Sequence, residues 1–238
     1  MKALVLAAGK GKRMLPLTED CPKALLPVDE KNMILDLLVQ NCMGAKDINE
    51  IIIVVNREQY HYFETWNVYQ NVSLCISPIE DNVIECLNYI INNIECEDIL
   101  IAAADNIVEF ELQSFINFYK EDVSKFAVMY YVENSIQELS RTGVALVDEG
   151  IVVTMEEKPQ RPKYRCAIPP FYIMPRRELE SLGEFLQSGI KVDSLGTYLS
   201  WYVNESEVRA YLMPGKRYNL GDRESYLKYR HSIQKMED

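Results

Sequence analysis

The sequence has few of the residues that build metal clusters or disulfide frameworks. It contains two histidines among 238 residues, and its six cysteines are scattered without any Cys-x-x-Cys pair. Structural zinc sites need clustered Cys and His ligands, so a zinc site is not expected. We interpret the cysteines as reduced, mostly structural thiols and expect a cytoplasmic protein.

Long apolar runs and an excess of positive charge are also missing. No stretch approaches the roughly 18 apolar residues that cross a membrane. The apolar run at the N-terminus stops at Ala8, before the length of about 7–15 residues that a secretory signal needs. The formal net charge is −11, whereas proteins that bind nucleic acid over a broad face are usually basic. We therefore expect neither a membrane nor a nucleic acid as partner.

What the sequence does contain is an alternation of strand and helix patterns up to Asp105. Continuous apolar runs predict buried strands, and apolar residues at helical spacing predict helices. The predicted strands cover 3–8, 50–55, 72–77 and 99–104, and the predicted helices cover 33–43, 60–69 and 83–94. This order predicts an α/β fold with a doubly wound, mostly parallel sheet.

The second half of the chain has a different pattern, in which strands dominate at first. A strand is predicted over 126–132, followed by a hairpin over 143–155 that turns at 148–150. Further strands are predicted over 166–174 and 208–212, and helices over 177–186, 195–203 and 223–233. With no internal repeat or Ser/Gly-rich linker, the sequence predicts one domain with two lobes.

A basic glycine loop follows the first predicted strand. Gly9 and Gly11 can adopt backbone angles that let several N–H groups point into one small space, which suits phosphate oxygens. Lys10, Lys12 and Arg13 add positive charge to the same loop. In a sheet of this kind, ligands bind at the carboxyl ends of the strands. The loop is therefore predicted to bind a small anion.

The loop is neither of two better-known phosphate loops. The P-loop pattern Gly-x4-Gly-Lys-Ser/Thr does not follow Ala8, and Met14 stands where the Rossmann fingerprint needs a third glycine or alanine. The longer pattern resembles the signature of the nucleoside-diphosphate-sugar pyrophosphorylases, the sugar-1-phosphate nucleotidyltransferases, and is most similar to their glucose-1-phosphate thymidylyltransferase branch. The matching strings are Leu6-Ala-Ala-Gly-Lys-Gly-Lys-Arg13, Leu15-Pro-Leu-Thr18 and Pro22-Lys-Ala-Leu-Leu-Pro-Val28.

This resemblance covers nearly the whole chain. It implies a fold and a separate binding role for each half of the chain. The fold would be a Rossmann-like, GT-A-like nucleotidyltransferase fold with an added substrate-binding lobe. Residues 1–238 would form a single domain, with a nucleotide-binding half over 1–125 and a sugar-phosphate-binding half over 126–238. The chain ends soon after the last predicted helix, so we expect no β-helical acetyltransferase tail of the kind found in some relatives.

The implied reaction joins a nucleoside triphosphate and a sugar-1-phosphate into a nucleoside-diphosphate sugar and pyrophosphate. It needs no covalent enzyme intermediate, so the protein's task is to position two anions and to offset charge on the leaving group. The resemblance implies that Arg13 grips the pyrophosphate and that Lys23 stabilises the α-phosphate region. The implied nucleotide-binding residues are Leu6, Ala7, Ala8, Gly9, Gly11, Arg13, Lys23 and Asp105.

The resemblance also implies Mg²⁺ as cofactor. Asp105, in Ala104-Asp-Asn-Ile107, matches the family's Gly-Asp-Asn-Ile string and would be a metal ligand, although a helix cap is an alternative role. The family's second ligand is the aspartate of Trp-x-Asp-Ile-Gly, and here Asn219 takes its place. Asparagine keeps an oxygen but loses the charge, so we expect weaker Mg²⁺ binding. Asp222 is interpreted mainly as a helix N-cap.

The implied sugar-phosphate site lies in the second half of the chain. Glu157 and Lys158, in Glu156-Glu-Lys-Pro159, would bind sugar hydroxyls and the sugar phosphate, respectively. Gly143 would let the backbone approach the sugar, and Tyr172 belongs to the same implied site. The surrounding segment 158–177 carries six cations and no acid, which indicates either a solvated loop or a face for a second negative group.

Alternatives stay open because the chain departs from the family pattern. Asp81-Asn82 is similar to the Asn-Asn pair of cytidylyltransferases for choline-like phosphates. An aromatic cage for a quaternary amine would support this alternative, and Tyr172, Tyr198, Trp201 and Tyr202 are candidates for it. A catalytically weak nucleotide-sugar-binding protein is a further alternative, whereas a glycosyltransferase usually carries an Asp-x-Asp that is missing at Asp105. The base, the sugar and the oligomeric state, including a homo-oligomer, remain open.

Overall fold

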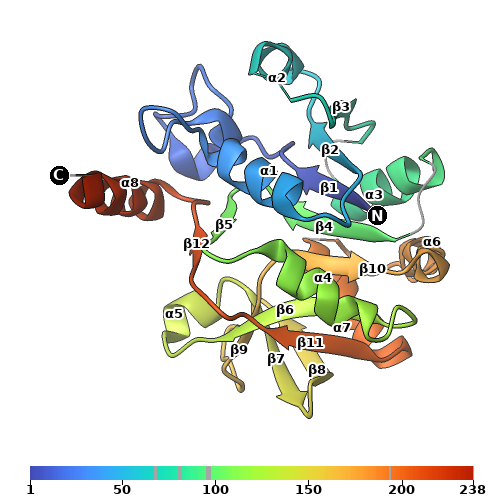
Figure 1. Cartoon of the computed structure of the whole chain (residues 1–238). Coiled ribbons are helices and arrows are strands. Elements are labelled where there is room, and N and C mark those ends of the chain that lie inside the picture. The colour runs from blue at the N-terminus through green and yellow to red at the C-terminus, as the bar shows by residue number, and fades with distance from the viewer. Residues whose placement is uncertain (67–68, 80–81, 95–97, 193, 238) are drawn as a thin grey trace. The chain divides into compact units, whose positions relative to one another are not determined.

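The computed structural model describes residues 1–66, 69–79, 82–94, 98–192 and 194–237 (Figure 1). These residues form two compact units, each assembled from separate parts of the chain. The first unit combines residues 1–77, 102–113 and 214–238, and the second combines residues 78–101 and 114–213. The implied nucleotide and sugar-phosphate roles of the two halves of the chain remain predictions.

Parallel strands form the centre of the first unit. Strand β1 (Lys2–Leu6) pairs with β2 (Glu50–Val55), and β2 pairs with β3 (Val72–Ile76), both in parallel. Residues 51–55 of β2 are all buried, as expected for a parallel strand covered on both faces. The three predicted strands are thus present, with bounds within two residues of the prediction.

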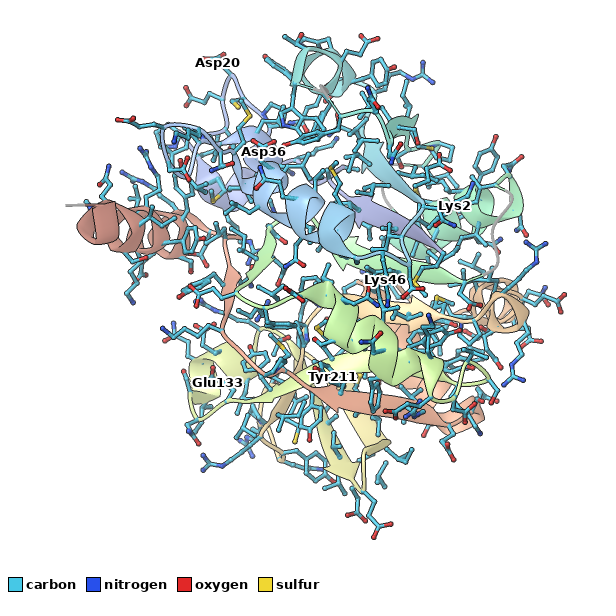
Figure 2. The ribbon with its side chains drawn as sticks, in the orientation of Figure 1. Lys2, Asp20, Asp36, Lys46, Glu133 and Tyr211 are labelled. Atoms are coloured by element: carbon cyan, nitrogen blue, oxygen red, sulfur yellow. The ribbon has the colours of Figure 1, made fainter. Side chains whose placement is uncertain are left out.

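Helix α1 (Ile34–Gly44) is fixed to the first unit by a buried carboxylate. Asp36 accepts a hydrogen bond of 2.7 Å from the backbone N–H of Met33 at the start of the helix. The same carboxylate also accepts from Trp66 Nε1 at 3.0 Å and from the hydroxyl of Tyr69 at 2.8 Å. Figure 2 labels Asp36 on helix α1. Trp66 ends helix α2 (Tyr60–Trp66), and residues 67–68 of the predicted helix lie outside the described residues. The Asp36 hydrogen bonds therefore join α1 to α2 and to the residue Tyr69 that precedes β3.

The predicted strand 99–104 is present, whereas two short strands of the first unit were missed by the sequence pattern. Strand β4 (Ile99–Ala103) ends where Ala104 donates a backbone hydrogen bond of 3.0 Å to Leu6. Immediately after it, β5 (Asn106–Val108) pairs antiparallel with β12 (Arg217–Asn219). Strands of this length are too short to show an alternating pattern, which is why the prediction did not contain them.

An apolar cluster connects the early loops to the end of the chain. Tyr226 and Tyr229, on the C-terminal helix α8 (Arg223–Glu237), belong to it, and the hydroxyl of Tyr226 donates to the carbonyl of Pro27 at 2.6 Å. The cluster therefore holds the segment around residues 14–28 against β5 and α8. Its buried members are Met14, Leu26, Val28, Ile34, Ile107, Leu220, Tyr226 and Tyr229.

Mixed strands form the second unit. Strand β6 (Phe126–Val132) pairs in parallel with β11 (Val208–Leu212), whereas β7 (Gly143–Asp148), β8 (Ile151–Glu157), β9 (Cys166–Ile168) and β10 (Phe171–Met174) form antiparallel pairs. The predicted hairpin turns at Glu149 and Gly150, both with positive φ. Proline cannot donate to a sheet ladder, so Pro169 and Pro170 split the predicted strand 166–174 into β9 and β10.

Helices complete the α/β fold, which confirms the predicted fold class. Helices α3 (Val83–Asn92) and α7 (Leu195–Glu205) occupy predicted segments, whereas α6 (Ser181–Gln187) begins later than predicted, after a 3₁₀ turn over Arg176–Glu178. Helices α4 (Leu112–Lys120) and α5 (Ile136–Leu139) were not predicted. Within the described part of the chain, every helix is too short or too polar to cross a membrane.

We predict that Met14 is the anchor of the glycine loop. Met14 is fully buried in the apolar cluster, whereas its neighbour Leu15 is 52% exposed. Met14→Ala is expected to lower the free energy of unfolding by about 2–5 kcal/mol, because it leaves a cavity in the core. Leu15→Ala is the matched control and should stay within about 0.5 kcal/mol of wild type. Urea unfolding measures both, and equal losses in the two variants would contradict the anchor role.

Candidate functional site

The entry to the glycine loop is fixed by hydrogen bonds to β2 and to the residue after it. The backbone N–H of Ala7 donates to the carbonyl of Val54 at 2.8 Å. The side-chain amide of Asn56, which is 2% exposed, donates to the carbonyl of Ala8 at 3.1 Å. The predicted nucleotide-binding residues Leu6, Ala7 and Ala8 therefore connect β1 to the glycine loop, and hydrogen bonds fix the position of this connection.

The loop itself turns at a residue with left-handed backbone. Gly11 has a φ of +63°, and a methyl group on it would lie 3.1 Å from Cγ2 of Thr18. The hydroxyl of Thr18 donates to the carbonyl of Gly11 at 3.0 Å, which ties the two ends of the loop together. A 3₁₀ turn over Lys12–Met14 follows, in which Met14 is buried while Lys12 and Arg13 are exposed. The loop thus presents Lys12 and Arg13 to solvent, and its predicted binding of a small anion remains a prediction.

The structure brings Lys23 and Asp105 into direct contact. Lys23 begins a 3₁₀ turn, and its Nζ lies 2.5 Å from Oδ2 of Asp105. Both side chains are largely buried, with exposures of 17% and 14%. These two residues were predicted from separate motifs, and the first unit places them in one ion pair. Because the pair is partly desolvated, its attraction is stronger than that of an exposed pair.

Asp105 is held on its other oxygen by Asn106. The side-chain amide of Asn106 donates to Oδ1 of Asp105 at 2.7 Å, and Arg217 Nε donates to Oδ1 of Asn106 at 2.7 Å. Burial of the carboxyl opposes its ionisation. The nearby charge and hydrogen bond of Lys23, followed by the charge of Arg217 and the hydrogen bond from Asn106, outweigh that effect and lower the pKa of Asp105. The site therefore keeps a buried carboxylate ionised.

The pairing of β5 with β12 brings Asn219 close to Asp105, because Asn219 lies opposite Asn106 in this pair. The backbone N–H of Leu220 donates to the carbonyl of Asp105 at 2.8 Å, which fixes the two segments to each other. A methyl group placed on Gly221 would lie 2.9 Å from Oδ1 of Asn219, 3.1 Å from Oδ2 of Asp105 and 3.2 Å from Nη2 of Arg13. Three of the predicted site residues therefore converge on the space beside Gly221.

Asp105 and Asn219 are the residues of this group that could hold a Mg²⁺ ion, although Oδ2 of Asp105 contacts Lys23 and Oδ1 of Asn219 accepts from the backbone N–H of Gly221 at 3.1 Å. One carboxylate oxygen and one amide oxygen face the same space beside Gly221, and Mg²⁺ is commonly bound by one or two carboxylates together with phosphate oxygens. In the part of the chain that the structure describes, no group of three or more His, Cys, Asp or Glu side chains is placed to hold a metal ion. Protein oxygens alone would thus leave most of the coordination to substrate and water.

Asp222 caps the helix that follows. Its Oδ1 accepts a hydrogen bond of 3.0 Å from the backbone N–H of Ser225 in the first turn of α8. The N-cap interpretation of Asp222 is therefore confirmed. Asn82 has a similar role, since its side chain accepts from the N–H groups of Ile84 and Glu85 at the start of α3. Its neighbour Asp81, from the predicted Asp81-Asn82 pair, lies outside the described residues.

In the second unit, Glu157 is held at the end of β8. The hydroxyl of Ser194 donates to Oε1 of Glu157 at 2.6 Å, and Lys158 Nζ lies 3.8 Å from the same oxygen. Lys158 has a φ of +46°, and its N–H donates to the carbonyl of Thr142 at 3.1 Å. The predicted residues Glu157 and Lys158 therefore lie together. Asp193, beside Ser194, lies outside the described residues.

Glycines surround the Glu157 carboxylate. Gly143 lies opposite Glu157 in the β7–β8 pair, and a methyl group on Gly143 would lie 3.0 Å from Oε2 of Glu157 and closer still to Met155. A methyl group on Gly196, in the first turn of α7, would collide with the same carboxylate. Glycine is therefore needed at both positions for Glu157 to occupy its place.

The predicted aromatic residues are packed in the core of the second unit. Tyr172 lies on β10 with its ring 6.0 Å from that of Phe126, and it is buried. Tyr198 and Tyr202 are also buried, and their hydroxyls bond to Ser181 at 2.6 Å and to Glu178 at 2.5 Å, respectively. Three of the four candidates for an aromatic cage are thus core residues that do not line an open cage.

Some cations of the basic segment 158–177 form hydrogen bonds or ion pairs within the chain. Arg165 donates to the side chain of Asn134 at 2.5 Å, and Arg177 Nε lies 3.3 Å from Oε1 of Glu178. Arg161 and Lys163 are exposed. The alternative that this segment binds a second negative group stays a prediction.

The sequence reading missed the residues that support the predicted ones. Asn106 stood inside the quoted motif, and Arg217 lies two residues before Asn219, so both sit on the site face of short strands that were not recognised. Ser194, Gly196 and Gly221 had no predicted role. The roles of the two glycines depend on side chains distant in the sequence that lie close to them, and no local pattern shows this.

Comparisons with known proteins agree with this fold. The family model described as nucleotidyl transferase matches residues 2–235, so the chain belongs to the nucleotidyl transferase family. The UTP–glucose-1-phosphate uridylyltransferase AglF of Haloferax volcanii is 31% identical over 187 residues, which cover 72% of this chain and 71% of the relative. The resemblance to sugar-1-phosphate nucleotidyltransferases is thereby confirmed.

Other relatives are longer than this chain. The glucose-1-phosphate adenylyltransferase of Photobacterium profundum is 27% identical over 201 residues, which cover 77% of this chain and 48% of that protein. The chain thus spans about half the length of this relative. A solved UDP-glucose pyrophosphorylase complexed with UDP-glucose has a TM-score of 0.84 at 22% identity and covers 99% of this chain and 98% of its own. This structural likeness shows the fold.

We predict that the ionised state of Asp105 contributes to stability. Its pKa is lowered in the folded chain, so the contribution is present above about pH 4, the ordinary pKa of aspartate, and is lost as pH falls through the lowered value. Asp105→Asn should cost about 1.5–3 kcal/mol near neutral pH, because Lys23 loses its partner. The exposed Asp20 provides a control, Asp20→Asn (Figure 2). Urea unfolding across pH tests this, and a cost of Asp105→Asn that did not shrink in acid would contradict it.

Two glycines in helices of the second unit provide a second test. Gly183 in α6 has open space around the position of a methyl group, whereas at Gly196 that methyl would meet Glu157. Gly183→Ala is expected to raise stability by up to about 1 kcal/mol through helix propensity. Gly196→Ala should show no gain, because the Glu157 carboxylate must move. Thermal unfolding compares the two, and equal gains would contradict the close approach.

Proposed function

We propose that the chain transfers a nucleoside monophosphate from a nucleoside triphosphate to a sugar-1-phosphate. In this reaction an oxygen of the sugar phosphate forms a bond to the α-phosphorus. The bond between the α-phosphorus and the oxygen that bridges to the β-phosphate breaks, and pyrophosphate leaves. The observation that carries the proposal is the convergence of Arg13, Asp105 and Asn219 beside Gly221 in a member of the nucleotidyl transferase family.

The first unit would bind the nucleoside triphosphate. The exposed Arg13 follows a loop that turns at Gly11, and its guanidinium can bind two pyrophosphate oxygens at once. Lys23 contacts Asp105 and brings an ammonium group to the same part of the unit. Charge placed in advance near the leaving group stabilises a transition state without reorganisation, which is the main catalytic task in phosphoryl and nucleotidyl transfer.

Asp105 and Asn219 would hold Mg²⁺ on their side-chain oxygens. The ion would supply further positive charge against the phosphates of the bound nucleotide. With one carboxylate in place of two, the pair offers less negative charge to the ion, so affinity for Mg²⁺ is expected to depend on the nucleotide. The protein's own contribution is to keep Asp105 ionised and fixed through Lys23 and Asn106.

The second unit would bind the sugar-1-phosphate. Glu157 accepts a hydrogen bond from Ser194 on Oε1, and its Oε2 lies against Gly143 and Gly196. As a carboxylate with several acceptor sites, Glu157 would accept hydrogen bonds from sugar hydroxyls. Lys158 is half-exposed and carries the charge for a phosphate group. AglF is named for glucose-1-phosphate and UTP, which makes a glucose-type sugar and a uridine nucleotide the first pair to test here.

Other candidate functions have less support. The burial of Tyr172, Tyr198 and Tyr202 counts against a cage for a choline-like phosphate. A nucleotide-sugar-binding protein with weak catalysis is favoured by one observation, the neutral Asn219 in the place of an aspartate. A cytoplasmic location is part of the proposal as well, because the described cysteines are free thiols.

The proposal is tested by measuring pyrophosphate release with Mg²⁺ for each pairing of a nucleoside triphosphate with a panel of sugar-1-phosphates and phosphocholine. We expect activity with a sugar-1-phosphate. Activity with phosphocholine alone would replace the proposal with the cytidylyltransferase. Silence across the panel, with nucleotide binding still visible by calorimetry, would favour the binding protein.

Lys23 provides a sharper test within the same assay. Lys23→Gln is expected to lower kcat/KM by about 10²–10³-fold, because a preorganised charge in the site is lost. Lys12→Gln removes the same charge from an exposed residue in the glycine loop and serves as matched control. It is expected to stay within about twofold of wild type, since surface substitutions usually have small effects. Equal losses in both variants would show general electrostatic attraction instead of a specific role for Lys23.

A further inference from the structure

A short chain of hydrogen bonds runs from Arg217 to the site carboxylate. Arg217 Nε donates to Oδ1 of Asn106 at 2.7 Å, and Nδ2 of Asn106 donates to Oδ1 of Asp105 at 2.7 Å. Asn106 is 2% exposed, so its amide depends on these partners for its hydrogen bonds. On the other side of the carboxylate, Lys23 contacts Oδ2. Both oxygens of Asp105 are therefore held by donors.

The amide of Asn106 can satisfy both neighbours in one orientation. Its NH₂ group faces a carboxylate that accepts, and its oxygen faces a guanidinium that donates. A flipped amide would place oxygen against the Asp105 carboxylate and NH₂ against Arg217, so both hydrogen bonds would be lost in a buried position. The guanidinium carries no acceptor, and it therefore fixes which end of Asn106 faces Asp105.

The β5–β12 pair explains how this chain is built. Asn219 lies opposite Asn106, and Arg217 lies two residues before Asn219 on the same strand. Side chains two residues apart on a strand share one face, so β12 presents both side chains toward the site. Asn219 contributes an oxygen to the space beside Gly221, while Arg217 is half-buried and bonds to the residue that supports Asp105.

We infer that Arg217 is a positioning residue that acts on the site through Asn106. It fixes the Asn106 amide, which in turn holds Oδ1 of Asp105 and sets the direction of Oδ2 toward the space beside Gly221. The inference rests on the proposed function, because the role of Asp105 in binding nucleotide and metal belongs to that proposal. In this role Arg217 acts through its hydrogen bond to Asn106 and needs no contact with substrate.

Steady-state kinetics of a double-mutant cycle separates this role from direct phosphate binding. Arg217→Leu is expected to lower kcat by about 10–100-fold, the usual effect of removing a residue that orients a metal or substrate ligand. KM for the nucleotide should change by less than about threefold, because uniform binding is retained. Lys216→Leu removes an exposed cation from the adjacent position and should leave kcat near wild type.

The cycle is completed with Asn106→Leu and the double variant. If Arg217 acts through Asn106, the double variant should lose no more activity than the more damaged single variant, because both substitutions break one pathway. Losses that multiply, or a rise in nucleotide KM with kcat unchanged for Arg217→Leu, would show direct contact with the phosphates and would overturn the inference. Arg217→Lys keeps the charge without the Nε donor, so full activity in that variant would also overturn it.

Nuclear magnetic resonance of the full chain provides a readout that does not need activity. The side-chain NH₂ signals of Asn106 are assigned by their loss in Asn106→Leu. We expect Arg217→Leu to shift these signals and to speed their hydrogen exchange, whereas Lys216→Leu leaves them in place. Unchanged Asn106 signals in a folded Arg217→Leu variant would overturn the inference. Because this result is independent of turnover, an enzyme that proves silent with every substrate pair refutes the proposed function while the role of Arg217 is still decided.

Discussion

The contact between Lys23 and Asp105 is the interaction on which the first unit's site depends. A largely buried carboxylate is costly unless it is paired and hydrogen-bonded. Lys23 at 2.5 Å and Asn106 at 2.7 Å meet that requirement, and the lowered pKa of Asp105 is the result. The contact joins a turn near the N-terminus to the end of β4, so the glycine loop and the strand end share one electrostatic centre.

The end of the chain completes this centre. Strand β12 pairs with β5, and helix α8 packs into the apolar cluster with Met14 and Leu26. This packing is what places Asn219 and Gly221 beside Asp105. The site of the first unit is therefore built from three separate parts of the chain. Burial of apolar side chains stabilises this arrangement, and the polar side chains are placed by it.

The second unit holds its carboxylate in a comparable way. Glu157 accepts a hydrogen bond from Ser194 and is surrounded by glycines, as Asp105 accepts from Asn106 and lies beside Gly221. In both places a glycine lies so close to a carboxylate oxygen that a side chain on the glycine would crowd that oxygen. A methyl group on Gly196 would collide with the Glu157 carboxylate, and one on Gly221 would lie 3.1 Å from Oδ2 of Asp105, so alanine would crowd the carboxylate in both places.

The sequence alone determined the strands 50–55, 126–132 and 208–212, because continuous or β-branched apolar runs produce a strong local signal. It also indicated Arg13, Lys23, Asp105 and Asn219 as a group, through motifs that resemble one family. The tertiary structure alone decided the contacts of these residues. Asn106, Arg217 and Gly221 support the site through a pairing of two three-residue strands that lie far apart in the sequence. Such short strands have no detectable period, and the space beside a glycine is defined by residues that no local pattern connects to it.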